Sequence, residues 1–400
     1  MPTITRALLS LLLLAPGVPL FAQTIPVTAR IPVRTLDSIG AHESFRGRKI
    51  RAMVMAPVMQ EGRVIVAPRT MLEGVIDETG TEHLAGARHF VHVRFTSLKS
   101  TNAQVAIDGV LTAVDNARES VDDGGRVLGP PLRSLVRSRA DWASLLLGSI
   151  DPVAGALLFS AFRGEAEERH RRVVFVPGTD MTVRLRVAAP LPMWPDDNTP
   201  AALAPDQTQR DLFLALPARG LTAGGRGPGD FVNIVLLGTQ AQVQRAFIAA
   251  GWDVPDRMST RADFDTFIKA AAAEGYQHQP VSAQTMFGRD PDLAFQRVTD
   301  TFAKRHHVRL WQTNVQWAGT PVWVAAATHD IGVLVSKEHR GFTHRVEDAI
   351  DLERDKIVDD LWTMQQIDQL GYLDRTPAPP PAERGAFQSD WRVAIVKLRP

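Results

Sequence analysis

The chain has 400 residues, of which 44% are hydrophobic and 22% are charged, and its formal net charge at pH 7 is +1. This length exceeds what one hydrophobic core usually organises, so two domains are expected. The balance of 45 basic and 44 acidic residues argues against a nucleic-acid partner, which normally requires a basic surface. Cysteine is absent, which excludes disulfides and thiolate metal sites.

The first 22 residues have the pattern of an export signal. "MPTITR" carries one positive charge, "ALLSLLLLA" is a short apolar run, and Ala22 offers a small residue for cleavage. The apolar run is shorter than the roughly 20 residues that cross a bilayer. We therefore predict a signal peptide over residues 1–22 and a periplasmic or cell-envelope location. Retention of the segment as an anchor stays open.

Residues 23–190 are expected to form a β-rich, barrel-like domain. Short runs rich in valine and isoleucine alternate with turn-forming residues at intervals of roughly 10–15 positions, which is typical of a barrel or sandwich. A further strand pair is predicted around the Pro177–Gly178 turn. The four clearest runs are 49–59, 62–76, 87–98 and 103–114.

One apolar stretch, residues 142–162, interrupts this domain. It is long enough to span a membrane, but Asp151 and Pro152 lie at its centre. A central Asp costs about 2.5–3.5 kcal/mol on insertion scales, and Pro breaks the hydrogen-bond ladder of a helix. An apolar helical insert packed on the barrel is therefore favoured, and membrane contact through this stretch stays the alternative.

Residues 191–229 are rich in proline, glycine and small polar residues and predict an exposed linker. A C-terminal α/β domain is expected over 230–375, followed by a proline-rich loop and a final strand over 376–400. The predicted fold class is therefore a multidomain α+β protein, with an N-terminal β-barrel-like or β-sandwich domain and a C-terminal mixed sheet with helices.

Within the C-terminal domain, alternating hydrophobicity predicts strands and a 3.6-residue period predicts helices. "FVNIVLLGT" is a buried strand, and the helix that follows it presents Val243, Phe247 and Ile248 on one face. Thr239 suits an N-cap better than a phosphate site, because no second glycine or lysine accompanies it. The other predicted elements are a helix over 263–275, strands over 306–313 and 321–336 joined at Gly319, a helix over 346–372, and a strand over 390–399.

No familiar catalytic motif occurs, so the candidate site is a cluster of histidines and carboxylates between residues 306 and 360. On the long helix, Glu353 falls in the centre of an apolar stripe, and Asp360 lies near the edge of that stripe. A buried carboxylate is costly unless it is paired or coordinates a metal. Glu353 is therefore expected to point inward.

Two interpretations of Glu353 stay open. In the functional one, Glu353, His307 and His329 form a catalytic acid–base group or ligate a divalent metal as the cofactor. In the structural one, Glu353 pairs with Arg309 or Arg345, and the histidines cap strand ends. His306 is expected to be a core residue in both.

Three tryptophans, Trp311, Trp317 and Trp323, lie near the turn at Gly319. They are expected either to pack in the core or to line a groove for a sugar or peptide. Core packing is the favoured interpretation.

Residues of about 230–365 are similar to the LssY-like C-terminal domain family of bacterial proteins. The segments that carry the resemblance are "FVNIVLLGTQAQVQRAFIAAGW", "PVSAQTMFGRDPDLAFQRV", "RHHVRLWQT", "PVWVAAATHDIGV" and "THRVEDAIDLERDKIVDDL". The resemblance implies a domain type and no particular reaction. The family's motif positions that coincide with the cluster are His306, His307, His329, Asp330, His344, Glu353, Arg354, Asp355 and Asp359.

The N-terminal region shows a partial resemblance to the β-barrel domain of TrbI-type conjugation proteins. "IVAPRTMLEGVI" and "VVFVPGTDMTVRLRV" carry it, although Arg69 replaces a small residue of the usual turn. The resemblance implies a barrel-like architecture alone.

We therefore hypothesise an exported envelope protein of binding or structural type, with envelope or secretion-system proteins as partners and no nucleic acid. The alternative hypothesis is a metal-assisted or His/Glu acid–base hydrolase with its site in the C-terminal domain.

Overall fold

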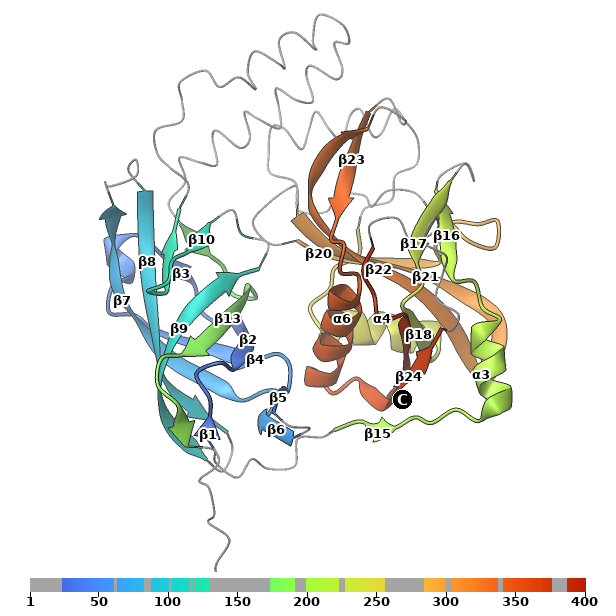
Figure 1. Ribbon diagram of the computed structural model, residues 1–400, viewed down its shortest axis with the longest axis horizontal. Helices are drawn as coiled ribbons and strands as arrows, with labels where there is room; N and C mark the ends of the chain where they lie inside the picture. Colours follow the sequence, from blue (N-terminus) through green and yellow to red (C-terminus); the bar gives the residue numbers. More distant parts are fainter. Residues whose placement is uncertain are drawn as a thin grey trace, which may run out of the picture.

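The chain forms a β-barrel and a mixed sheet with helices, which lie side by side in the computed structural model (Figure 1). The structure describes residues 24–60, 63–82, 88–100, 103–115, 117, 119–129, 173–190, 199–222, 227–255, 284–298, 304–336, 341–375 and 387–400. Within these ranges, no helix has the length and apolar character needed to cross a bilayer. The predicted signal peptide, the insert at 142–162 and the helix at 263–275 lie outside the described residues.

The barrel closes because β8 pairs with β9 as well as with β7, so that six antiparallel strands run in the order β8-β7-β4-β2-β13-β9 and back to β8. The six strands are β2 (Arg30–Thr35), β4 (Lys49–Val54), β7 (Met71–Glu82), β8 (Arg88–Lys99), β9 (Gln104–Val114) and β13 (Asp180–Leu185). The smaller elements are β1 (Thr24–Ile25), β3 (Ile39–Gly40), η1 (Glu43–Phe45), β5 (Val58–Gln60), β6 (Arg63–Val66), β10 (Ser120–Val121), β11 (Arg126–Leu128), β12 (Val174–Phe175) and β14 (Ala189–Pro190).

The alternation of the strands explains the closed shape, because every second side chain points into one core. Ile31 and Val33 of β2, Ile76 of β7 and Phe95 of β8 are almost completely buried there. Gly74 and Gly109 lie against Phe95, where a Cβ atom would approach neighbouring atoms closely. The predicted barrel-like fold is confirmed, and the specific likeness to TrbI-type barrels stays a prediction.

The C-terminal unit is built on a mixed sheet whose strand order is β15-β24-β25-β18-β22-β21-β20, with β23 added beside β22. Its strands are β15 (Ala201–Ala202), β18 (Ile234–Leu237), β20 (Leu293–Val298), β21 (Lys304–Trp317), β22 (Thr320–Ser336), β23 (Gly341–Val346), β24 (Ile367–Asp374) and β25 (Arg392–Leu398). A three-stranded sheet joins β17 (Pro228–Phe231), β16 (Arg219–Thr222) and β19 (Gln284–Thr285). The helices among the described residues are α3 (Gln207–Leu214), α4 (Gln240–Ala249) and α6 (Asp351–Thr363).

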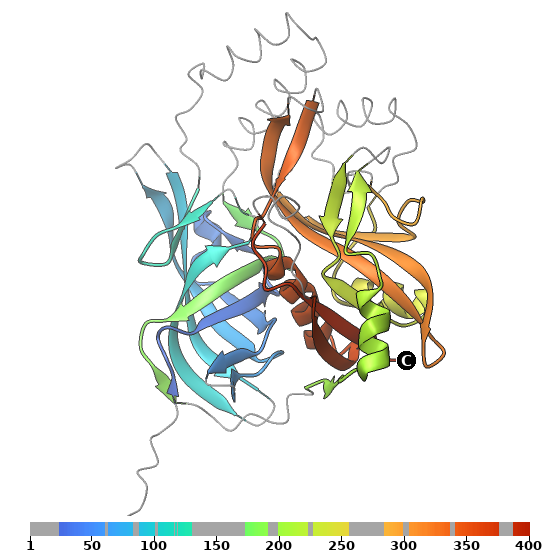
Figure 2. The same cartoon turned by 45° about the vertical axis from the view of Figure 1, so that its right-hand side comes forward.

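Apolar residues fill both faces of this sheet, as the continuous hydrophobic run of β18 predicts. On one face, the sheet packs against α4 and α6 through residues such as Phe247 and Leu361. On the other face, Phe213 of α3 packs among Trp311 and its neighbours. Figure 2 shows β21 and β22 as the long strands that cross this unit.

The C-terminal prediction needs three corrections. The helix predicted over 346–372 is α6 alone: it ends at Thr363, Gln365 takes a positive φ of 56°, and the chain continues as β24. Ile248 is 60% exposed rather than part of the buried helix face. The described part of the predicted linker contains β15, α3 and β16, and Phe213 in it is almost fully buried. The domain boundaries themselves stay a prediction.

Candidate functional site

The helix α6 lies between the mixed sheet and the barrel, which explains why it buries charged residues as well as apolar ones (Figure 1). Ile357 and Leu361 pack into the core of the sheet. Glu353 and Asp360 are 2% and 1% exposed, and their partners include residues of β21 and the barrel. The expectation that Glu353 points inward is therefore confirmed.

Two histidines of the sheet lie directly opposite each other on the face that α6 covers. His306 in β21 pairs in register with His329 in β22. Their rings are stacked, with centroids 4.2 Å apart and an interplanar angle of 17°. Both belong to the strand faces that carry Val308 and Ala327, so alternation places them toward α6 rather than toward the opposite core.

His306 joins the two halves of the molecule. Its Nδ1 lies 2.6 Å from Oε2 of Glu353, and its Nε2 lies 2.8 Å from Oδ2 of Asp115, which follows β9 of the barrel. Because an ionised carboxylate only accepts hydrogen bonds, both ring nitrogens must donate and the ring must be an imidazolium. Burial alone would lower the pKa of His306, but the two carboxylates outweigh burial and raise it to about 9.

The two carboxylates that face His306 respond differently to their surroundings. Burial would raise the pKa of Asp115, but His306 and Lys356 hold it well below its usual range. Glu353 is more deeply buried, and burial raises its pKa in spite of His306. Its second oxygen, Oε1, has no hydrogen-bond partner among the described residues. Asp115 is thus the firmly ionised member of the three.

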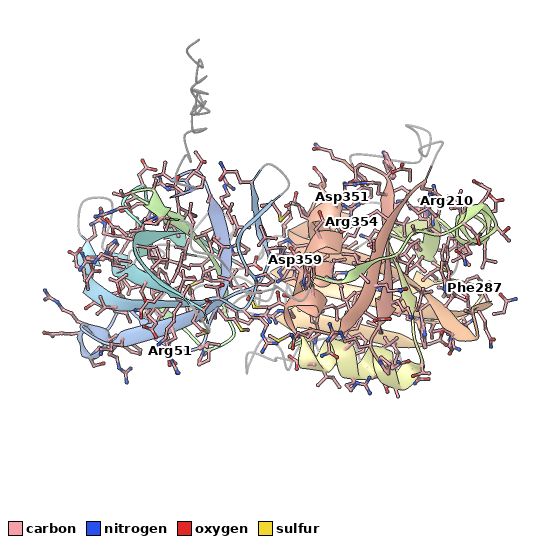
Figure 3. All side chains as sticks on the ribbon, turned by 90° about the horizontal axis from the view of Figure 1, so that it is seen from below. Arg51, Arg210, Phe287, Asp351, Arg354 and Asp359 are labelled. Atoms are coloured by element: carbon pink, nitrogen blue, oxygen red, sulfur yellow. The ribbon has the colours of Figure 1, made fainter. Side chains whose placement is uncertain are left out.

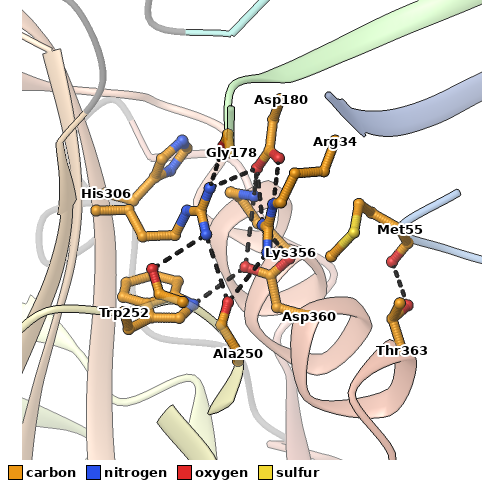
Figure 4. A network of polar contacts seen from close by, with 12 residues as sticks. Arg34, Met55, Gly178, Asp180, Ala250, Trp252, His306, Lys356, Asp360 and Thr363 are labelled. Carbon is orange, nitrogen blue, oxygen red and sulfur yellow. Dashed lines mark hydrogen bonds and ion pairs between the residues drawn. The ribbon is translucent and has the colours of Figure 1, made fainter. Parts of the chain in front are cut away.

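A second charged group continues the contact between barrel and α6 (Figure 4). Arg34 of β2 makes a bidentate pair with Asp180, at 2.6 and 3.0 Å, and reaches Asp360 at 3.0 Å. Lys356 binds Asp180 at 2.7 Å. Burial disfavours the charged forms of Arg34 and Asp180. The carboxylates of Asp180 and Asp360 nevertheless raise the pKa of Arg34. The three nearby cations likewise lower the pKa of Asp180.

Further contacts extend this network to β20 and to the segment that follows α4. Arg297 lies 3.4 Å from Asp180 and donates to the carbonyl of Gly178 at 3.0 Å. The indole of Trp252 donates to Asp360 at 3.0 Å. Among the described residues of this boundary, four cations and four carboxylates balance. The cations are Arg34, Arg297, His306 and Lys356, and the carboxylates are Asp115, Asp180, Glu353 and Asp360.

The other tandem histidine, His307, faces the opposite side of the sheet. Its Nε2 lies 2.6 Å from the hydroxyl of Thr328, and its Nδ1 lies 3.5 Å from Asp330. Arg309, on the same face, binds Asp230 at 2.7 Å. Burial raises the pKa of Asp330 to about 7, against the attraction of Arg305 and Arg309.

The structure therefore groups different residues from those in the predicted site. Glu353 binds His306, which was expected to be core, and His307 belongs to a separate group on the other face. His329 lies beside His306, as the hairpin geometry predicted for one of the tandem histidines. The expected pair between Glu353 and Arg309 is wrong, because Arg309 binds Asp230. The side chains of His344 and Arg345 lie outside the described residues.

Sequence patterns did not indicate the barrel residues that complete the site. Asp115 is 191 positions from His306, and Arg34 is 326 positions from Asp360. Nothing in the local pattern of either segment points to the other.

Other residues singled out in the sequence have structural partners. Thr239 forms a capping box with Gln242 at the start of α4, as expected of an N-cap. Trp311 and Trp323 are completely buried on opposite faces of the sheet, which supports the core interpretation of these rings. Arg354 is 1% exposed and joins α6 to Asp390 just before β25, and Figure 3 shows it on this helix near Asp351 and Asp359.

A cavity of about 480 Å³ lies on the barrel, away from these groups. Among the described residues that line it, Arg30 alone is titratable. The described lining therefore offers no acid–base pair.

The sequence comparisons bear on the C-terminal unit alone. Residues 214–390 match the family model described as the LssY C-terminus. No curated protein matches the chain. The matched region begins at the end of α3 and includes His306, His329, Glu353 and the strands that position them. The C-terminal unit of this protein is therefore an LssY-like C-terminal domain.

Proposed function

We propose that this protein is an exported cell-envelope protein of binding or structural type, in which the barrel holds the LssY-like domain in one fixed orientation. Envelope or secretion-system proteins are its partners. The N-terminal pattern of one basic residue, an apolar run and Ala22 supports export.

One observation carries the structural part of this proposal. Among the described residues, charged side chains of the barrel and of the LssY-like domain are paired with one another across the boundary between barrel and sheet. Such a network costs desolvation free energy and fixes geometry, because any displacement separates charges that lack water. A protein that holds two domains rigidly is suited to presenting a surface.

Expression of the full chain in a Gram-negative host tests export. We expect a product that begins near residue 23, by intact mass, in the periplasmic fraction. The matched control is a chain that lacks residues 1–22 and stays in the cytoplasm. Recovery of the uncleaved full chain from the cytoplasm would contradict export.

A metal-assisted or acid–base hydrolase is the second candidate, because Asp115, His306 and His329 bring one carboxylate and two imidazoles together. Purified protein is incubated with nitrophenyl phosphate, ester and glycoside substrates, with and without Zn²⁺. The binding or structural proposal expects no turnover above that of His329→Ala. Metal-dependent turnover that this variant loses would favour the hydrolase.

A further inference from the structure

Three ligand-type side chains meet where the barrel contacts the sheet. Asp115 comes from the barrel, and His306 and His329 come from β21 and β22. One potential ligand atom from each lies within 4.8 Å of the other two. His306 is buried, whereas the carboxylate of Asp115 is 30% exposed, which leaves the cluster a side open to solvent.

We propose that Asp115, His306 and His329 form a divalent-cation site of the zinc class. Two imidazoles and one carboxylate are a donor set that Zn²⁺ and similar borderline cations bind, with a water in the fourth position. With bonds of about 2.1 Å, tetrahedral ligand atoms lie roughly 3.4 Å from one another. The 2.8 Å between His306 and Asp115 must widen by about 0.6 Å to admit the ion.

Glu353 supplies the independent support for this site. It accepts the Nδ1 proton of His306 at 2.6 Å and is itself 2% exposed. A ligating histidine commonly donates its other ring N–H to a carboxylate, which orients the ring and fixes the tautomer. Glu353 therefore holds His306 with Nε2 directed at Asp115, as a metal ligand requires.

Binding of the ion has a defined proton balance. The Nε2 proton of His306 leaves to solvent, because that nitrogen becomes a ligand atom. Asp115 and Glu353 then face a divalent ion and a neutral imidazole in place of an imidazolium, and Lys356 stays near both carboxylates.

The ion would join the two parts of the molecule, because one ligand lies on the barrel and two lie on the LssY-like domain. This distinguishes the proposed site from the predicted group of His307, His329 and Glu353, which lies within one domain. It also stands whether or not the chain is exported.

Chelator-treated protein is dialysed against Zn²⁺ or Co²⁺ and assayed by elemental analysis, by the visible spectrum of bound Co²⁺ and by thermal unfolding. We expect one ion per chain, a four-coordinate Co²⁺ spectrum, and a higher Tm with the ion. His329→Ala and Asp115→Asn should each weaken binding at least tenfold. Glu353→Gln should weaken it about 10- to 100-fold.

His92→Gln is the matched control, because His92 also pairs with an aspartate at 2.6 Å, Asp77, but lies on the barrel wall. His307→Gln separates the proposed site from the sequence-predicted one. Both variants should keep wild-type affinity. Circular dichroism of the metal-free variants establishes that each is folded. Asp115→Asn is the variant least prone to unfold, because the side chain of Asp115 is 30% exposed, against 5% for His306 and 2% for Glu353.

Two results would overturn the proposal. One is a wild-type protein that takes up no more ion than the chelator-treated blank. The other is an affinity that His307→Gln abolishes while folded Asp115→Asn leaves it unchanged, which would locate the ion on the opposite face of β21.

Discussion

The two faces of β21 show how one strand serves two environments. His306 and His307 are adjacent and equally buried, at 4% exposure each. His306 binds carboxylates 47 and 191 positions away, one of them in the barrel. His307 contacts Thr328 and Asp330 in the neighbouring strand β22. Burial alone therefore does not distinguish the residue that joins two domains from the residue that belongs to one sheet.

The difference between the two faces of β21 predicts that substitutions on them lower the free energy of unfolding by unequal amounts. A change on the His306 face leaves charges from two domains unpaired, and these charges cannot regain water without separating the domains. A change on the His307 face disturbs one group within a sheet.

Asp180→Ala should have the largest effect, because Arg34, Arg297 and Lys356 all lose their shared carboxylate. We expect a loss of about 3–5 kcal/mol in the free energy of unfolding. Chemical denaturation followed by tryptophan fluorescence measures it. Arg51→Ala, on the outer barrel surface in Figure 3, removes an exposed pair with Asp37 and should change little. Equal effects of the two variants would contradict the network's role.

Glu353→Gln should lower the free energy of unfolding by about 2 kcal/mol, because it removes the charge of a buried hydrogen bond to an imidazolium while conserving shape. Asp355→Asn on the same helix is the control. Its side chain is 49% exposed and pairs with Arg354, so its loss should be below about 1 kcal/mol. Both losses in the free energy of unfolding are measured in metal-free buffer. A loss for Asp355→Asn as large as that for Glu353→Gln would contradict the prediction.

A double-mutant cycle compares the two histidines directly. His306→Gln and Asp115→Asn should be coupled by about 1–2 kcal/mol, because their side chains share a hydrogen bond. His307→Gln and Asp115→Asn should add within about 0.5 kcal/mol. Strong coupling of His307 to Asp115 would show that the two faces are not independent.

Asp359→Asn should have the smallest effect and depend on pH. Burial, then Asp355 and Asp360, raise the pKa of Asp359 to about 8, so the folded state disfavours its ionised form. Stability contributed by the protonated group is present below its ordinary pKa near 4 and is lost as the pH rises through 8. The variant should therefore gain about 1–2 kcal/mol over the parent at pH 9 and none at pH 4. Asp368→Asn, 40% exposed beside Lys397, should show no such difference.

Much of the local structure was predictable. The periodic segments of the sequence match the strands β18, β21, β22 and β25 and the helix α4. Hydrophobic periodicity reveals such elements because it depends on only a few neighbouring residues. The inward position of Glu353 followed from its place in the apolar stripe of α6. The end of α6 was missed because the turn depends on Gln365 in a left-handed conformation, which glutamine rarely adopts.

The sequence by itself determined that His306 and His307 point to opposite faces, since side chains alternate along a strand. It also determined that His329 lies on the face of one of them. Only the tertiary structure decided which face meets the barrel, and hence that Asp115, Arg34 and Asp180 complete the cluster. The reason is physical: these contacts join segments more than a hundred positions apart, and their geometry depends on how two separately cored units pack.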